Sequence, residues 1–426
     1  MSKPTGLENT PSSFIAGRFP TTRLFSVASS ECRKALPSDL TSGEVLHYSI
    51  PSIQEYGEAQ VEAADLILSE KLVIDSEAVL ISKLNPRKAT VLLAEPESSI
   101  PAVASTEFVV VRAETNADNR FLSWVLRSRD VSTFLNERVQ SVTKSHQRVD
   151  PRLISGLGVP WPGAEDRRRI AGYLDRETSQ IDAMMSELDE LVRILDVRRV
   201  EAVAQAVHLA QGDDELPAGW VRMPMKYAVL ESFTGEWGED AGVGEVDVPC
   251  VRVADFDRAT RTVGQDEIPT IRSLPASKAS AKALRPNDLL VERSGGTAVN
   301  PVGNVVLYVG PEGAVSSNFI ECVRVDEAHH DPRYWWLLQY AAYRTGFTHT
   351  HVRQTTGIQN LDARGFFSEP LPVPDLSEQR RVVDEVERTM TRVDAMLADA
   401  RRLKDLLAER RAALITDVIT GKKEAA

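Results

Sequence analysis

The chain contains a long internal repeat, in which its C-terminal part matches a stretch of its N-terminal half at a constant offset of almost half the chain length. The matched segments are 147–152 with 359–364, 160–162 with 372–374, 168–170 with 380–382, 181–184 with 393–396, and 198–199 with 410–411. A repeat of this size dictates architecture before any local signal does. We therefore expect two similar halves, each a variable region followed by a similar long helix, which suits a target that itself has two parts.

Composition limits the classes of protein that this chain can belong to. A chain of 426 residues is too long for one ordinary core, so two or more domains are expected. It has no run of about 18 apolar residues and no apolar signal-peptide core near its start, which predicts a cytoplasmic protein without a membrane span. The three cysteines are scattered and form no CxxC pair, so neither a zinc site nor a disulfide framework is indicated.

The net charge of −12 argues against a protein whose whole surface attracts nucleic acid. A local basic face is still compatible with this balance, because phosphate contacts need only local lysines and arginines. Any interface with DNA should therefore be confined to particular loops.

The repeated segments predict two long helices, from about residue 165 to 208 and from about 377 to 420. Each follows a Pro-x-Pro pair, which is expected to be extended because proline disfavours helix in the residue before it. Ser377 is the expected N-cap of the second helix, and Gly421 lies where a C-cap glycine belongs.

Apolar residues step through both segments by three and four, the spacing of a coiled-coil seam. They are Ile170, Leu174, Ile181, Met185, Leu188, Val192 and Leu195 in the first helix, and Val382, Val386, Met390, Val393, Leu397, Ala400, Leu407, Leu414 and Val418 in the second. Thr178, Arg199, Lys404 and Arg411 interrupt the seam. The matched lengths favour antiparallel pairing of the two helices; the alternative is that each helix packs on the core of its own domain.

The variable regions, about 1–156 and 214–371, are predicted to be mixed α and β. Apolar runs typical of strands lie at 78–82 and 108–111 in the first region, and at 288–293, 305–308 and 319–325 in the second. Helices are expected at 121–126 and 334–340. The second region thus follows the same order of elements as the first.

This arrangement resembles the DNA-specificity subunit (S subunit, HsdS) of type I restriction–modification systems. Residues 370–381 (PLPVPDLSEQRR) are similar to that family's approach to its second conserved helix, and residues 409–422 (ERRAALITDVITGK) to its C-terminal end. Segments 80–87 (LISKLNPR) and 104–108 (ASTEF) look like pieces of a target-recognition domain. The first repeat departs from the pattern, because GAEDRR replaces DLSEQR at the start of its helix.

The resemblance implies an α+β fold with a pseudo-twofold internal repeat: target-recognition domains at 1–156 and 214–371, and conserved coiled-coil helices at 157–213 and 372–426. It implies that each domain reads one half of a bipartite site in double-stranded DNA and that the helices set the spacer. It also implies two modification (methyltransferase) subunits and a restriction subunit as partners. S-adenosylmethionine, ATP and Mg would be bound by those partners, and no cofactor by this chain.

Candidate DNA-binding residues lie in four polar, cationic segments, because arginine and lysine bind phosphate and guanine, and asparagine and glutamine bind adenine. They are Lys83, Asn85, Arg87, Lys88, Lys144, His146, Arg148, Arg293, Ser294, Gly295, Gly296, Thr297, His349, His351, Arg353, Gln354 and Thr355. A solvated surface loop is the alternative for each segment. Gln147, Asp150 and Arg152 recur as Gln359, Asp362 and Arg364, which indicates a shared structural role rather than base reading.

The sequence offers no catalytic motif. Segments 85–87 (NPR) and 300–302 (NPV) lack the second proline and the aromatic residue of a DNA methyltransferase, and no P-loop is present. His329, His330, His349 and His351 are expected to be loop histidines rather than metal ligands, and Asp288 and Glu292 to belong to a strand edge. Two alternatives stay open: a DNA-binding module outside restriction, and a nuclease or methyltransferase with an unrecognised site.

Overall fold

The computed structural model describes residues 8–40, 43–96, 99–139, 147–210, 215–297, 299–355 and 357–425. The chain divides into two compact units, one formed by Met1–Leu188 with Arg402–Ala426 and the other by Asp189–Arg401. Each unit therefore contains one variable region and a part of both long helices. Within the described residues, no helix combines the length and the apolar character that a membrane span requires.

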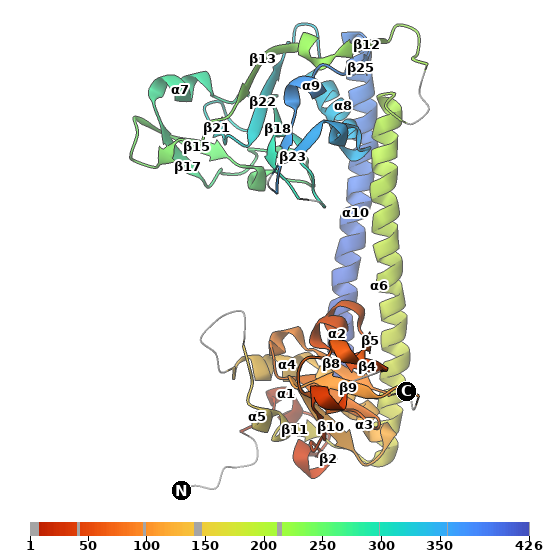
Figure 1. Ribbon diagram of the computed structural model, residues 1–426. Coiled ribbons are helices and arrows are strands. Elements are labelled where there is room, and N and C mark those ends of the chain that lie inside the picture. The colour runs from red at the N-terminus through yellow and green to blue at the C-terminus, as the bar shows by residue number, and fades with distance from the viewer. Residues whose placement is uncertain are drawn as a thin grey trace. The chain divides into compact units, whose positions relative to one another are not determined.

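The two long helices are α6 (Ala164–Ala206) and α10 (Leu376–Ile419) (Figure 1). In the first unit, one buried cluster combines Ile170, Leu174 and Ile181 of α6 with Leu407, Leu414 and Val418 of α10. In the second unit, another combines Val203, Ala204 and Val207 of α6 with Val382, Val386 and Met390 of α10. The start of one helix thus lies beside the end of the other in each unit, which confirms antiparallel pairing.

The same clusters also contain residues of the variable regions. Phe121 and Leu122 belong to the first cluster, and Trp335 and Leu338 to the second. Packing between the helices and packing of each helix on a domain core were expected as alternatives. The structure combines them, so each domain is anchored on the helix pair by apolar burial.

Two of the polar residues that interrupt the seam are held by ion pairs. Arg411 Nε lies 2.9 Å from Asp182 Oδ1 in the first unit, and Arg199 Nη1 lies 2.8 Å from Asp394 Oδ1 in the second. These pairs are repeat equivalents, since the sequence offset aligns Asp182 with Asp394 and Arg199 with Arg411. Each unit, taken by itself, therefore has the same antiparallel register.

The predicted cap of the second helix was wrong by two residues. Asp375 Oδ1 accepts hydrogen bonds from the backbone N–H of Glu378 (3.0 Å) and the hydroxyl of Ser377 (2.6 Å), so Asp375 caps α10 and Ser377 lies inside its first turn. A carboxylate at this position also meets the positive end of the helix dipole. Gly421, with φ of 74°, confirms the predicted left-handed C-cap.

The first variable region is built on two sheets. One has the order β2-β10-β7-β8, and its strands are Ala28–Ser29, Phe108–Ala113, Ala78–Ser82 and Val91–Ala94. The other has the order β3-β6-β9-β4-β5, with strands Lys34–Ala35, Lys71–Val73, Ala102–Ser105, Glu44–Tyr48 and Gln60–Ala63. A short pair joins β1 (Thr21–Arg23) to β11 (Gly158–Pro160). The longer helices are α2 (Ile50–Tyr56), α3 (Asn116–Arg127), α4 (Arg129–Asn136) and α5 (Pro151–Ser155).

The second variable region has the same plan. Its central sheet has the order β13-β22-β18-β20-β16, with strands Val229–Thr234, Ile320–Val325, Leu289–Glu292, Val305–Tyr308 and Thr262–Val263. A second sheet contains β14 (Glu239–Asp240), β17 (Ile271–Leu274), β15 (Val246–Val251) and β21 (Val315–Ser316), and β12 (Val221–Pro224) pairs with β25 (Pro370–Val373). The helices are α7 (Ala276–Ala281), α8 (Pro332–Arg344) and α9 (Ala363–Phe366).

The repeat in the fold is longer than the repeat in the sequence. Strands β10 and β22 begin at Phe108 and Ile320, which the same sequence offset relates, and they pair in the same sense with β7 and β18. In both regions this strand is followed by a helix, α3 or α8, whose buried face covers the sheet. Strands β7 and β18 are buried along their whole length, which explains their continuous apolar runs. All the strands and helices predicted in the variable regions are confirmed.

Candidate nucleic-acid interface

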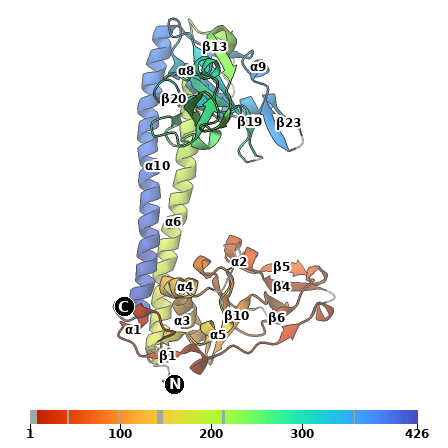
Figure 2. The same cartoon turned by 90° about the vertical axis from the view of Figure 1, so that its left-hand side faces the viewer.

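In the second unit, several predicted DNA-binding residues meet in a small three-stranded sheet. Strand β24 (Ile358–Leu361) lies between β19 (Ser294–Gly295) and β23 (Val352–Thr355). Figure 2 labels β19 and β23. Asn360 is opposite both Ser294 and Arg353, and Gln359 is opposite both Gly295 and Gln354. The loop after β18 and the hairpin β23–β24 therefore form one surface, although they are far apart in sequence.

Side chains alternate between the faces of a sheet, so Ser294, Arg353 and Asn360 share one face. The hydroxyl of Ser294 donates to the amide oxygen of Asn360 (2.6 Å). The side chain of Arg353 is 77% exposed and donates to Asp362 (2.7 Å). An arginine and an asparagine on one exposed face are the side chains that pair with guanine and adenine edges.

The opposite face fixes the loop that follows β19. Gln359 Oε1 accepts a hydrogen bond from the backbone N–H of Val302 (3.2 Å). Gly296 has φ of 61°, and a Cβ there would lie 2.8 Å from both Gln359 Oε1 and Val302 N. Glycine permits this close approach. The recurrent Gln359 thus has structural contacts, as expected from its repetition.

Arg293 and Thr297 lie at the two ends of this loop. Arg293 Nη1 donates to the hydroxyl of Thr234 and lies 3.6 Å from the carboxylate of Glu321, so Arg293 braces the central sheet. Thr297 is exposed, and its hydroxyl accepts from the backbone N–H of Asn300 (3.0 Å). Thr355 ends β23, in the hairpin of Arg353 and Gln354.

The two predicted histidines do not join this face. His351 is half-buried, with Nε2 3.3 Å from Glu369 and its ring against Phe347 and Phe366. His349 is exposed, packs on the ring of Tyr343 and lines a separate cavity. His351 supports the base of the hairpin, whereas His349 belongs to a different surface.

The first unit repeats these contacts with different side chains. The backbone N–H of Val149 donates to Lys83 O (3.0 Å), as that of Leu361 donates to Arg293 O (2.8 Å). Leu84 forms a bridge with Arg148, where Ser294 pairs with Asn360. Lys83, Leu84 and Arg148 therefore correspond to Arg293, Ser294 and Asn360. The side chain of Arg148 is 61% exposed and donates to Glu107 (2.5 Å).

A cationic turn continues from this bridge. Asn85 has φ of 50°, a left-handed conformation that asparagine tolerates, and donates its N–H to Gln147 O (2.7 Å). Arg87 and Lys88 follow in the 3₁₀ turn Pro86–Lys88 and are exposed. Lys88 Nζ donates to Gln54 Oε1 (2.8 Å). Lys144 and His146 lie outside the described residues.

The carboxylates considered as nuclease-like groups lie at the two ends of β18, which is an interior strand and not the expected edge. Asp288 is buried, and its oxygens accept from Nε (2.9 Å) and Nη2 (2.8 Å) of Arg324. Burial raises the pKa of Glu292 to about 7, against a smaller lowering effect of Arg258. Asp288 is thus part of a structural ion pair, and Glu292 supports the loop that begins at Arg293.

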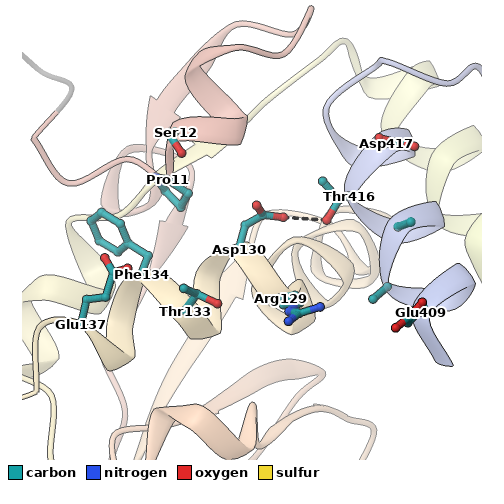
Figure 3. Close-up of a pocket in the computed structure, with 12 residues that line it drawn as sticks. Pro11, Ser12, Arg129, Asp130, Thr133, Phe134, Glu137, Glu409, Thr416 and Asp417 are labelled. Carbon is teal, nitrogen blue, oxygen red and sulfur yellow. Dashed lines mark hydrogen bonds between the residues drawn. The ribbon is translucent and has the colours of Figure 1, made fainter. Parts of the chain in front are cut away.

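A cavity of about 580 Å³ lies between α4 and the C-terminal part of α10 in the first unit (Figure 3). Thr416 donates to Asp130 (2.6 Å) at its edge. Its charged lining residues are Arg129, Asp130, Glu137, Glu409 and Asp417. Four carboxylates against one arginine would repel DNA phosphates, so this cavity is not part of the interface. In the described part of the chain, no group of three or more His, Cys, Asp or Glu side chains is arranged to hold a metal ion.

Comparison with known proteins agrees with this geometry. No family model matches the chain. The type I restriction enzyme StySPI specificity subunit of Salmonella potsdam is 22% identical over 319 residues, covering 69% of this chain and 68% of that protein. The HsdS subunit from Thermoanaerobacter tengcongensis has the same fold, with a TM-score of 0.50, 18% identity, and 95% of this chain and 97% of that chain covered. A chain from a study of complex assembly and conformational transition of the type I R-M system has a TM-score of 0.74, with the same identity and coverage.

In sequence and in fold, the chain is similar to the DNA-specificity subunits of type I restriction–modification systems. HsdS is the non-catalytic specificity subunit of its complex, and the expectation that this chain is not itself an enzyme agrees with this similarity. The α+β fold with two sheet-rich domains and two packed helices is that of HsdS structures.

One residue of the candidate surface was not predicted from the sequence. Asn360 is exposed between Ser294 and Arg353, whereas the prediction covered only its neighbour Gln359, as a recurrent residue. The repeat carried the signal, because Asn360 aligns with Arg148, which was predicted to bind DNA.

Proposed function

We propose that each half of this specificity subunit reads one half of a bipartite DNA site, through domains 1–156 and 214–371. The observation that carries the proposal is the pair of equivalent surfaces, one centred on Arg148 and the other on Asn360, each formed by the same strand ends. Such loops on a rigid sheet are suited to base reading, since the scaffold fixes where the side chains point.

The two surfaces carry different side chains at equivalent positions, which supports recognition of two different half-sites. Arg148 corresponds to Asn360 in the repeat, and Asn85 corresponds to Gly295 because each lies opposite one of the equivalent residues Gln147 and Gln359. Arginine pairs best with guanine and asparagine with adenine. We therefore infer an asymmetric site, with the helices at 157–213 and 372–426 setting the length of the unread spacer.

Exposed apolar residues on the two helices support two copies of one partner. They are Met184, Leu191 and Ile194 on α6, and Met396, Leu403 and Leu406 on α10, each 37–55% exposed. The repeat offset relates every member of the first set to a member of the second, and the spacing of seven and three places each set on one helix face. Exposed apolar stripes on charged helices mark interaction surfaces. We infer that each stripe binds one modification subunit.

The chemistry would then lie in the partners. The modification subunits would bind S-adenosylmethionine, and a restriction subunit would use ATP and Mg. The specificity subunit would bind double-stranded DNA in the cytoplasm and hold no cofactor. A preparation of the chain free of partners should transfer no methyl group from labelled S-adenosylmethionine to DNA; transfer by such a preparation would contradict this assignment.

The proposal is tested by substitutions in each half. In complex with the modification subunit, Arg148→Ala should relax one half-site and Asn360→Ala the other, each costing roughly 1–3 kcal/mol at the position read. Binding is measured to duplexes mutated in one half-site at a time. The exposed Arg285, which pairs with Glu312 away from either surface, provides the control variant Arg285→Ala. Loss of discrimination at both half-sites from one substitution would contradict separate reading.

A further inference from the structure

Each unit contains a basic pocket where its variable region meets the helix pair, and the two pockets are bordered by equivalent elements. In the second unit, a cavity of about 400 Å³ is lined by Arg258 and Arg261 after β15, by Asn300 before β20, and by Tyr343 and Arg344 at the end of α8. The exposed His349 lines one side of this cavity.

In the first unit, a cavity of about 810 Å³ is lined by Gln54 after β4, Lys88 before β8, and Arg127 at the end of α3. Asp182 and Arg411 of the helix pair complete it. Strands β4 and β15 are counterparts, since each pairs in parallel with the strand before β10 or β22, and β8 and β20 each flank β7 or β18. The two halves have thus kept a pocket at one place in the fold although its residues differ.

Positive charge is in excess in both pockets. The first is lined by Lys88, Arg127 and Arg411 and a single carboxylate, Asp182. Among the described residues, no carboxylate lines the second; Asp394 and Asp196 lie behind it, bound to Arg261 and Arg344. Because Arg199 also pairs with both of these aspartates, three arginines share two carboxylates there, and Arg258 adds a fourth positive charge to the pocket lining.

In each pocket, one exposed cation is held by an amide rather than by a carboxylate. Lys88 Nζ donates to Gln54 Oε1 (2.8 Å), and Arg258 Nη1 donates to Asn300 Oδ1 (3.0 Å). Within the described chain neither cation forms an ion pair, although the charge of Arg258 acts on Glu292, so both side chains can still bind an anion from solvent. Arg261 is buried, and its Nε has no hydrogen-bond partner there.

Each pocket includes a residue from the loop that forms the reading surface of its unit, meaning the surface centred on Arg148 or on Asn360. Lys88 ends the turn that starts at Asn85, and Asn300 belongs to the loop that starts at Ser294. On the other side, Asp182 and Arg411 are close in sequence to Leu188 and Arg402, where the helices leave the first unit. Asp196, which binds Arg344 (2.5 Å), is equally close to where α6 joins the second.

We propose that each pocket binds backbone phosphates of the DNA on the spacer side of the half-site that its unit reads. This inference rests on the proposed function. Lysine and arginine contacts to phosphate carry no sequence information but fix the register of the protein on the duplex. Two such contacts, one beside each reading surface, would hold the unread spacer and so align both half-sites with their domains.

The test uses the complex with its partner subunits and the variants Lys88→Ala and Arg258→Ala. Each should weaken binding to specific and to unrelated duplexes by the same factor, roughly tenfold, and lower the salt slope by about one. Lys34→Ala and Arg285→Ala are matched controls, because these exposed cations pair with Glu70 and Glu312 outside the pockets. The controls should leave affinity unchanged.

A second arm locates the phosphates. Uncharged methylphosphonates are placed singly in the spacer, and a contacted phosphate should weaken binding of the wild-type complex more than that of the matching variant. Unchanged affinity and salt slope in both variants would overturn the proposal, as would variants that weaken only the association with the modification subunit, which would make an acidic partner surface the occupant. Loss of the proposed function is a separate result, seen when the wild-type complex fails to discriminate half-site mutants.

Discussion

Gly296 shapes the loop that follows β19, because its backbone is left-handed and a Cβ would lie 2.8 Å from Gln359 Oε1 and Val302 N. Gly296→Ala should destabilise the loop by roughly 1–3 kcal/mol and weaken recognition of the second half-site alone. Gly172→Ala is the contrast, since a Cβ at that helical position meets open space and should stabilise the protein by about 1 kcal/mol. Urea titrations and half-site binding measure both, and equal effects of the two variants would contradict this account.

Glu292, which precedes the same loop, makes the stability of the protein depend on pH. Its pKa of about 7 lies above the ordinary value of 4.5. As pH rises, the folded state therefore keeps a proton that the unfolded state has already released. Its contribution to stability is therefore full below pH 4.5 and is lost as pH rises through 7, by roughly 2–4 kcal/mol in all. Glu292→Gln should flatten the fall in unfolding free energy between pH 5 and pH 8; an unchanged slope would mean that other groups cause it.

At the residue scale, the sequence located cations but not their partners. Arg353 and Ser294 were predicted to lie in DNA-facing loops, whereas their contact with Asn360 depends on the pairing of β19 and β23 with β24, which no local pattern encodes. Likewise, Arg293 was predicted to face DNA but donates to Thr234 on the central sheet.

At the element scale, the long helices show which features of a helix the sequence pattern can predict and which it cannot. Their ends were predicted to within about two residues, because the repeat and the apolar spacing define them. The cap was misplaced, since Asp375 and Ser377 are both good caps and only the backbone decides between them. Asp375→Ala should therefore cost about 1 kcal/mol of unfolding free energy, and Ser377→Ala clearly less. Thermal unfolding of the two variants checks this, and the reverse order would restore Ser377 as the cap.

The paired helices contain two equivalent ion pairs in different surroundings. Arg199 and Arg261 are buried around Asp394, whereas Asp182 and Arg411 are more exposed. Asp394→Asn should remove a negatively charged partner from two buried guanidinium groups and lower the free energy of unfolding by roughly 1–3 kcal/mol, more than Asp182→Asn.

The short strands of the second sheets were not predicted, since a strand of so few residues shows no clear alternation of apolar and polar side chains.

At the scale of the whole molecule, the proposed function requires the helix pair to set the distance between the two half-sites. Inserting seven residues after Leu188 in α6 and after Leu403 in α10 keeps the facing of the helices, since seven residues are close to two turns. The inserted length, about 10 Å, corresponds to about three base pairs of DNA.

The measurement that tests the central claim most directly is a map of the bases modified in DNA by the complex, made with the wild-type chain and with this lengthened chain. We expect a two-part recognition sequence for the wild type. For the lengthened chain we expect the same two parts, separated by about three more unspecified base pairs. A single continuous recognition sequence, or a spacer that stays the same after the insertion, would contradict the proposed function.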